Sequence, residues 1–158
     1  MFTRRSLFLT SLTGVFLLSC APAKEFPKPF HGQQLQFGQG GGFTGGLDFF
    51  VLLDDGRLFK RAPMDSSFTL ITTWEKPFVQ QMFSNYHTLR LDEVNHYEPG
   101  DKYYFIQYQK GTEPLHRIAW GKPGFVPDPN TVTFYNLLFK STKSKSRGHS
   151  TLSCSTPS

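Results

Sequence analysis

Cysteine is nearly absent from this chain, which has only Cys20 and Cys154 among its 158 residues. A network of disulfides is therefore excluded, and the fold must be held together by a hydrophobic core. Seventeen Phe and six Tyr residues can supply that core, since each aromatic side chain buries a large apolar area. Cys154 lies in a polar segment, where we expect it either to be idle or to pair between molecules.

The residue spacings typical of catalytic and metal sites are also missing. The five histidines are scattered singly, without a His-Glu-x-x-His pair, and no serine stands in a Gly-x-Ser-x-Gly motif. Asp54 and Asp55 could form a carboxylate pair for acid–base catalysis, but their place before Gly56 favours a tight turn. We therefore predict no enzymatic activity, no metal and no other cofactor.

An excess of positive charge is missing from the central part of the chain, although the formal net charge is +5. Six of the 17 basic residues lie outside residues 24–139, so eleven remain there against all 12 acidic residues. A nucleic-acid-binding domain concentrates basic side chains on its folded surface. The distribution argues against nucleic acid as a partner.

The first twenty residues contain an apolar run that is too short to cross a membrane. Arg4 and Arg5 precede residues 7–18, which are mostly apolar, whereas a transmembrane helix needs about 20 residues. A basic start, a short apolar segment and a small residue before the cleavage point are typical of a secretory signal. We expect cleavage after Ser19.

Leu17-Leu18-Ser19-Cys20 resembles the lipobox of bacterial lipoproteins. The resemblance implies that residues 1–19 are a signal peptide and that Cys20 becomes a lipidated N-terminus, anchored in the cell envelope by several acyl chains. Ala21, in place of Asp, favours the outer membrane in such lipoproteins. The alternative is an uncleaved buried helix in which Cys20 is incidental. Residues 3–9 also resemble a twin-arginine signal, so both the Sec and the twin-arginine export routes stay open.

Composition divides the rest of the chain into three parts. Residues 20–33 hold three prolines and little apolar pattern, which predicts a lipidated tether. Residues 34–140 are predicted to form one domain. Residues 141–158 contain ten Ser or Thr and almost nothing apolar, so we expect a disordered tail.

Apolar patterning predicts an α+β fold for the domain. Runs and alternations of β-prone residues predict strands at 34–37, 47–53, 57–61, 67–74, 103–108 and 115–120. Helices are expected to begin at Lys76-Pro77 and after the capping residue Asp128. Their predicted core faces are Phe78, Met82, Phe83 and Tyr86 in the first helix and Val132, Tyr135, Leu138 and Phe139 in the second. No parallel βαβ series is visible, which indicates an antiparallel sheet with two helices on one face.

Six glycines lie between Gly38 and Gly46, around Phe43 and Thr44. Because glycine permits positive φ and close backbone approach, three interpretations stay open. The segment could form a bulge or kinked crossover, cradle a phosphate group, or present Phe43 to a partner. The absence of a following Lys-Ser or Lys-Thr disfavours the phosphate site.

Gly41-Gly42-Phe43-Thr44-Gly45 resembles the Gly-Gly-Phe-Ala-Gly segment of emfourin-like proteins, which are small inhibitors of thermolysin-type metallopeptidases. The expected order of elements is also similar. The resemblance implies a partner-binding loop at residues 41–45, with Phe43 entering the peptidase cleft. Small envelope lipoproteins also share a Gly-Gly-Phe-Thr-Gly loop and a late Trp-Gly, here Trp120-Gly121.

We therefore predict a membrane-anchored, non-enzymatic protein-binding module that uses residues 39–46, with metallopeptidase inhibition as its most concrete form. One alternative is a structural envelope protein that contacts anionic lipid through Lys140, Lys143, Lys145 and Arg147. The other is an enzyme or small-ligand carrier with Tyr103, Tyr104 and Trp120 in one pocket.

Overall fold

A computed structural model gives the structure of the chain and describes residues 25–43, 45–63 and 67–146. The elements in chain order are β1 (Gln33–Gly41), β2 (Gly46–Leu53), β3 (Arg57–Arg61), β4 (Phe68–Thr73), α1 (Lys76–Thr88), the short 3₁₀ helix η1 (Leu91–Glu93), β5 (Tyr97–Glu98), β6 (Lys102–Lys110), β7 (His116–Trp120) and α2 (Pro129–Ser146). The predicted signal peptide, Cys20 and residues 147–158 lie outside the described residues.

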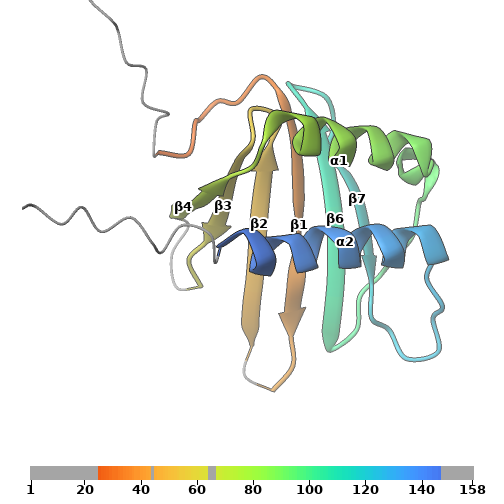
Figure 1. Cartoon of the computed structure of the whole chain (residues 1–158). Coiled ribbons are helices and arrows are strands. Elements are labelled where there is room, and N and C mark those ends of the chain that lie inside the picture. The colour runs from red at the N-terminus through yellow and green to blue at the C-terminus, as the bar shows by residue number, and fades with distance from the viewer. Residues whose placement is uncertain (1–24, 44, 64–66, 147–158) are drawn as a thin grey trace, which may run out of the picture.

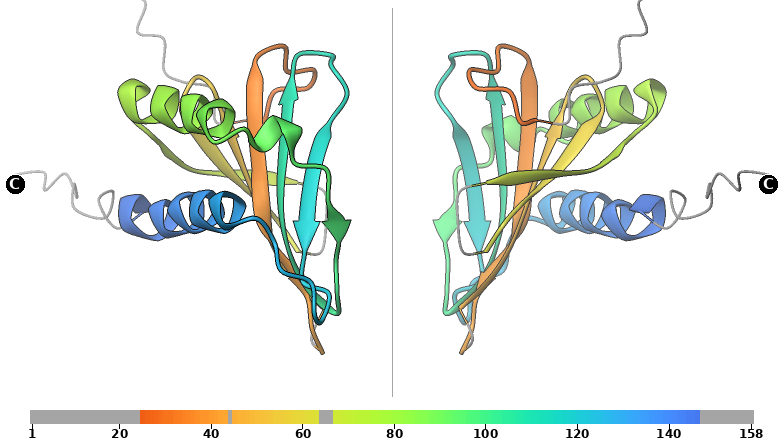
Figure 2. Two further views of the ribbon diagram at one scale, coloured as in Figure 1. Left: turned by 90° about the vertical axis from the view of Figure 1, so that its right-hand side faces the viewer. Right: turned by 90° about the vertical axis from the view of Figure 1, so that its left-hand side faces the viewer.

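The strands form one seven-stranded sheet in the order β4-β3-β2-β1-β6-β7-β5. Neighbouring strands are antiparallel except at the β7 edge, where the two-residue strand β5 pairs in parallel. Both helices lie on the same face of this sheet, crossing it one above the other (Figure 1, Figure 2). The predicted α+β fold, with two helices on one face of an antiparallel sheet, is confirmed.

The core lies between the helices and the sheet. Side chains alternate along a strand, so Leu35 and Phe37 of β1 point toward the helices together with Ile106 of β6, which pairs with Phe37. All three are fully buried. The helices close the core with Val79, Met82, Phe83 and Tyr86 of α1 and Phe134, Tyr135 and Leu138 of α2.

Both helices begin where the sequence predicts. Pro77 stands in the first turn of α1, and Asp128 caps α2 by accepting a hydrogen bond from the Thr131 N–H at 3.0 Å. The predicted faces were incomplete, because Val79 and Phe134 are buried as well, and Val132 is only partly buried. Phe78 is partly buried against the core and packs edge-on against Trp74, with 5.1 Å between ring centroids.

The predicted end of the domain at residue 140 was wrong. Helix α2 continues to Ser146, and Thr142 is buried on it. The Thr142 hydroxyl donates a 2.8 Å hydrogen bond to the Phe139 carbonyl oxygen. A Ser/Thr-rich composition disfavours a packed helix, but here the hydroxyl is satisfied by the helix itself, so burying it is not costly.

The predicted tether at residues 20–33 is also shorter than expected. The Phe26 ring stacks on Phe68 with centroids 4.3 Å apart and meets Phe59 edge-on at 5.2 Å. Together with Phe30 it packs against Val51, Leu53 and Phe59, on the sheet face away from the helices. Residues from Phe26 onward therefore belong to the domain, because the apolar β2–β3–β4 surface needs cover.

The core position of Phe37 can be tested against the exposed position of Phe43. We expect Phe37→Ala to lower the free energy of unfolding by about 3–5 kcal/mol, since it leaves a cavity under the helices. The matched change Phe43→Ala should alter it by less than about 0.5 kcal/mol. Urea denaturation followed by circular dichroism measures both values. Equal losses in the two variants would contradict this assignment of core and surface.

Candidate functional site

The glycine-rich segment forms a projecting hairpin and not a long loop. Strand β1 continues to Gly41, strand β2 begins at Gly46, and these two residues pair. The predicted loop at 39–46 is therefore reduced to residues 42–45, and a regular antiparallel hairpin replaces the bulge or crossover interpretation. Its end projects beyond the rest of the sheet (Figure 1).

Strand β6 supports the base of the hairpin from its other side. The ladder between β1 and β6 runs as far as Gly41 and Lys102. The Gly42 N–H donates a 2.7 Å hydrogen bond to the Asp101 carbonyl oxygen, and the Gly45 N–H donates a 3.0 Å bond to the Gly42 carbonyl oxygen. The turn is thus fixed both internally and to the start of β6. Sequence reasoning missed Asp101, because it acts through its backbone carbonyl oxygen. Its signal in the sequence is the turn-forming pair Pro99-Gly100 just before it.

Gly41 occupies a position that no other residue can take without a shift of the backbone. A Cβ there would lie 1.9 Å from the Asp101 carbonyl oxygen, and its φ of +84° lies in the left-handed region. Gly42 and Gly45 also have positive φ, at +79° and +62°, but have open space around them. These three glycines therefore permit the left-handed backbone conformation that the turn requires on both sides of the tip.

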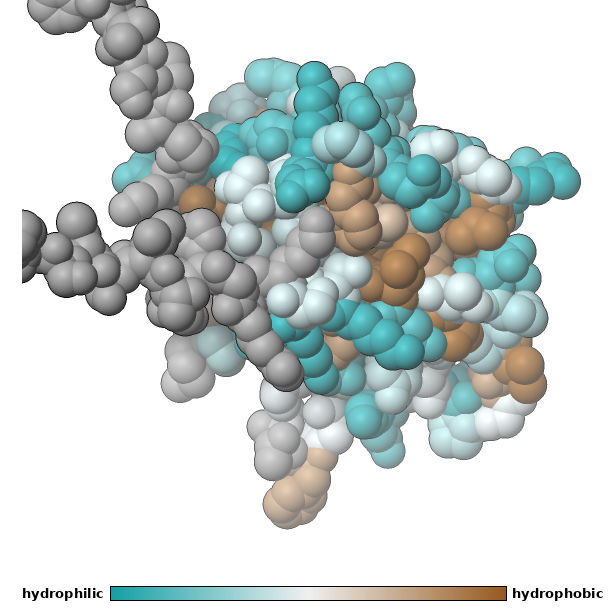
Figure 3. Space-filling view, in the orientation of Figure 1, coloured by the Kyte–Doolittle hydropathy of each residue, from teal (hydrophilic) through white to brown (hydrophobic). Residues whose placement is uncertain are grey.

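Phe43 stands at this tip and is 109 % exposed, so its ring is fully open to solvent. The space-filling view shows hydrophobic surface at the projecting end of the hairpin (Figure 3). The structure thus brings Gly41, Gly42, Phe43 and Gly45 together in one turn. Thr44, the remaining predicted loop residue, lies outside the described residues.

A cavity of about 490 Å³ lies beside the hairpin and is lined by its backbone together with Gln39, Asp48, Pro63 and Lys102. The Asp48 carboxylate forms a 2.9 Å ion pair with Lys60 and accepts a 3.2 Å hydrogen bond from the Gln39 amide. Burial by itself would raise the pKa of Asp48, but these hydrogen bonds and the positive charges of Lys60 and Lys143 outweigh it. The net result is a lowered pKa.

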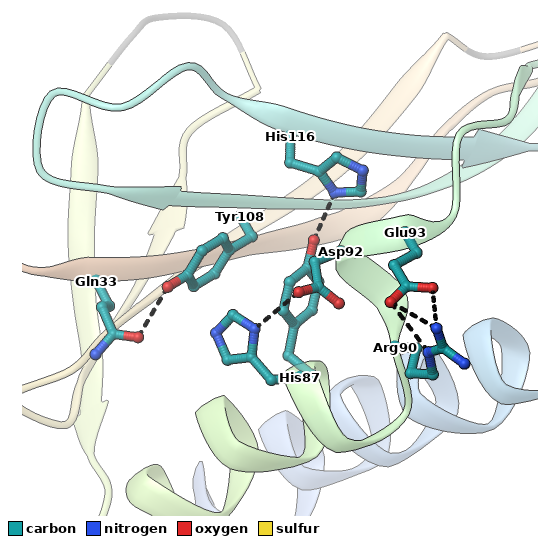
Figure 4. Close-up of polar contacts among 8 residues, drawn as sticks. Gln33, His87, Arg90, Asp92, Glu93, Tyr108 and His116 are labelled. Atoms are coloured by element: carbon teal, nitrogen blue, oxygen red, sulfur yellow. Dashed lines mark hydrogen bonds and ion pairs between the residues drawn. The ribbon is translucent and has the colours of Figure 1, made fainter.

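A second polar group joins the C-terminal part of α1 to the sheet (Figure 4). The Tyr86 hydroxyl lies 2.5 Å from His116 Nδ1, and the Tyr108 hydroxyl donates a 2.9 Å bond to Gln33. Burial, and then the negative charge of Asp92, raises the pKa of Tyr86. Tyr86 is fully buried, so its contact with His116 is structural. Thirty residues separate the two in sequence, so the sequence alone does not pair them.

The predicted tight turn at Asp54-Asp55-Gly56 joins β2 to β3, and both of its carboxylates accept hydrogen bonds from backbone N–H groups. Asp54 accepts a 2.7 Å hydrogen bond from the Gln33 N–H, and Asp55 accepts one of 3.0 Å from the Arg57 N–H. Asp55 also forms a 2.7 Å ion pair with Arg57. Within residues 25–43, 45–63 and 67–146, no group of three or more His, Cys, Asp or Glu side chains could hold a metal ion.

The aromatic pocket considered from the sequence does not form. Tyr104 and Trp120 stack with centroids 5.8 Å apart, and Tyr135 of α2 meets both rings edge-on. Their neighbour Tyr103 lies on the opposite face of β6, because side chains alternate along a strand. The three residues therefore cannot line one pocket.

Comparison with known proteins gives no assignment for this chain. A scan against models of known protein families finds no match, and a search of curated proteins finds none. Of the helices in the described part of the chain, none has the length and apolar character that crossing a membrane requires.

The lowered pKa of Asp48 predicts a pH-dependent contribution to stability. A carboxylate with a lowered pKa stabilises the fold above its unfolded-state pKa, and this stabilisation is lost as the pH falls through the folded-state pKa. Asp48→Asn should therefore lower the free energy of unfolding by about 0.5 kcal/mol at pH 7, which is the scale of a partly exposed ion pair. At a pH below the folded-state pKa of Asp48, the substitution should have no effect. Urea denaturation at both pH values measures it.

Asp101→Asn provides the control, because the Asp101 side chain is exposed and forms no ion pair among the described residues. Two results would show that the Asp48 ion pair is not the source of the lost stability. One is a loss of unfolding free energy in Asp48→Asn that is the same at pH 7 and in acid, and the other is an equal loss in Asp101→Asn.

Proposed function

We propose that this chain is a non-enzymatic, lipid-anchored envelope protein that binds another protein through the tip of the β1–β2 hairpin. The observation that carries the proposal is the full exposure of Phe43 on a turn whose backbone is fixed by Gly41 and Asp101. Burying a Phe ring in a partner is worth about 1.5–3 kcal/mol. Hydrogen bonds already hold Gly42 and Gly45, so ordering these residues on binding costs little conformational entropy and more of this gain is kept.

The position of the first described residues supports protein binding through the hairpin tip. Residues 21–24 separate Cys20 from the described residues, and the five extended steps from Cys20 to Glu25 reach at most about 18 Å. The Glu25 carbonyl oxygen accepts a 3.4 Å hydrogen bond from the Arg57 guanidinium at the start of β3, so Glu25 lies beside the β2–β3 turn, at the end of β2 opposite the hairpin tip. The nine residues of β1 span roughly 30 Å. A lipid on Cys20 would hold one end of the domain close to the membrane and direct Phe43 away from it.

A narrow two-stranded projection with one apolar side chain at its end suits a cleft better than a flat surface. This shape agrees with the resemblance of residues 41–45 to inhibitors of thermolysin-type metallopeptidases. We therefore propose peptidase inhibition as the specific form of binding, with Phe43 in an apolar substrate pocket of the enzyme. The supporting backbone would resist distortion, because Gly42 is tied to Asp101.

Site-specific crosslinking tests whether the tip contacts a protein. We expect the photoreactive residue benzoylphenylalanine, placed at position 43 in the lipidated chain, to give a discrete adduct with an envelope protein in living cells. The same residue at exposed position 113, in the β6–β7 turn at the other end of the sheet, is the control. Absence of an adduct from position 43, or an identical adduct from both positions, would contradict binding through the tip.

Titration of the chain into thermolysin, in the presence of a peptide substrate, tests whether the protein inhibits metallopeptidases. Stoichiometric inhibition is expected, and Phe43→Ala should weaken it by at least about tenfold, which is the loss of 1.4 kcal/mol. If thermolysin is not inhibited but position 43 still gives a crosslinked adduct, the inhibitor hypothesis is rejected. Binding of another protein through the hairpin tip is then retained.

The proposed anchor makes a separate prediction for the two cysteines. Cys20→Ser should abolish incorporation of a radiolabelled fatty acid, because the thiol is the proposed site of lipid attachment. Cys154→Ser should leave incorporation unchanged. Labelling that survives Cys20→Ser, or that is lost in Cys154→Ser, would contradict the proposed anchor.

A further inference from the structure

The sheet face away from the helices is covered over only part of its width. Phe26 and Phe30 pack on the β2–β3–β4 side of this face. Toward β6, β7 and β5, no helix of the described residues lies over it (Figure 2). A cavity of about 420 Å³ opens there, which we call the open-face cavity, lined by Leu47, Phe49, Arg61, Tyr97, Pro99, Gly100, Tyr103, Phe105, Gln107, Arg117 and Ala119.

The floor of the open-face cavity is aromatic because β1 carries glycine there. A Cβ on Gly38 would lie 3.0 Å from the Phe105 ring, and one on Gly40 would lie 2.6 Å from the Tyr103 hydroxyl. The rings of β2 and β6 can therefore lean across β1, where Phe49 and Phe105 approach to 5.3 Å between centroids. This brings an apolar surface together from strands that do not pair with each other.

Two arginines stand at the sides of this floor, from strands that are far apart in the sheet. The Arg61 guanidinium of β3 lies over the Phe49 ring at 5.8 Å, and that of Arg117 on β7 lies over the Tyr97 ring at 5.9 Å. Arg117 is exposed and makes no ion pair with any carboxylate among the described residues. None of the lining residues is acidic.

A buried amide completes the polar part of the site. Gln107 is only 8 % exposed and lies directly opposite Arg117 in the β6–β7 ladder. An amide beside a guanidinium can supply both a donor and an acceptor to a bound group. The guanidinium fork matches carboxylate and phosphate geometry, and it is less costly to desolvate than an ammonium group.

We propose that the open-face cavity binds a small amphipathic anion, with an apolar or ring-containing body and a carboxylate, phosphate or sulfonate group. Its volume lies within the range of about 300–1,000 Å³ usual for small-molecule sites. The ring body rests on Phe49 and Phe105, and the anionic group is held by Arg117 and Gln107. This site is separate from the hairpin tip and does not depend on the proposed function.

Two fluorescent probes separate the anionic requirement from the apolar one. The full chain with Cys20→Ser is titrated with 8-anilinonaphthalene-1-sulfonate and with its neutral relative N-phenyl-1-naphthylamine. We expect saturable binding of one sulfonate probe per chain. The Kd should rise at least tenfold in Arg117→Gln and remain unchanged in Arg90→Gln, which removes an equal charge at the exposed Arg90–Glu93 pair. The neutral probe should bind more weakly and be insensitive to Arg117→Gln.

Amide chemical shifts locate the bound probe, and competition identifies the source of the anion. The sulfonate probe should shift the amides of Gln107, Arg117 and Ala119 and leave those of α1 unchanged. Displacement by 2-naphthoate supports a soluble ligand, and displacement only by phosphatidylglycerol vesicles supports a lipid headgroup. Unchanged affinity in Arg117→Gln, equal affinity for the neutral probe, or shifts confined to the helices would each overturn the proposal.

Discussion

Strand β1 is the constraint on which the rest of the structure depends. It is the central strand of the sheet and pairs with β2 on one side and β6 on the other along almost its whole length. Toward the helices it presents Leu35 and Phe37, which are fully buried. Toward the other face it presents Gly38 and Gly40, which leave room for aromatic rings from both neighbours. One strand thus specifies the core, the aromatic face and the hairpin.

The same arrangement separates the features that we consider functional. The helices cover one face, so Phe26 and the open-face cavity both lie on the other. The projecting tip and the N-terminal side of the domain lie at opposite ends of the molecule (Figure 1). A proposed lipid anchor, a protein-binding tip and a small-anion site can therefore coexist without competing for the same surface.

Local signals in the sequence identified most elements of this fold. The Asp-Gly step at residue 56, Pro77 and Asp128 each determine a nearby turn or helix start through one backbone interaction, so they can be read without tertiary information. The glycines of β1 could not be interpreted in the same way. Glycine is compatible with a loop, and only the approach of Asp48, Tyr103 and Asp101 to the β1 backbone shows that strand pairing continues to Gly41. The long-range contacts of Phe26 with Phe68 and of Arg117 with Tyr97 were missed for the same reason.

The central claim is that the hairpin tip faces away from the membrane while the other end stays close to it. Lipid quenching measures this directly in vesicles that contain the lipidated chain with Cys154→Ser and a fluorophore on one introduced cysteine. With spin-labelled lipid headgroups as quenchers, we predict strong quenching for a fluorophore in Lys28→Cys and almost none in Phe43→Cys. Strong quenching at position 43 would place the tip at the bilayer and contradict this account of its function.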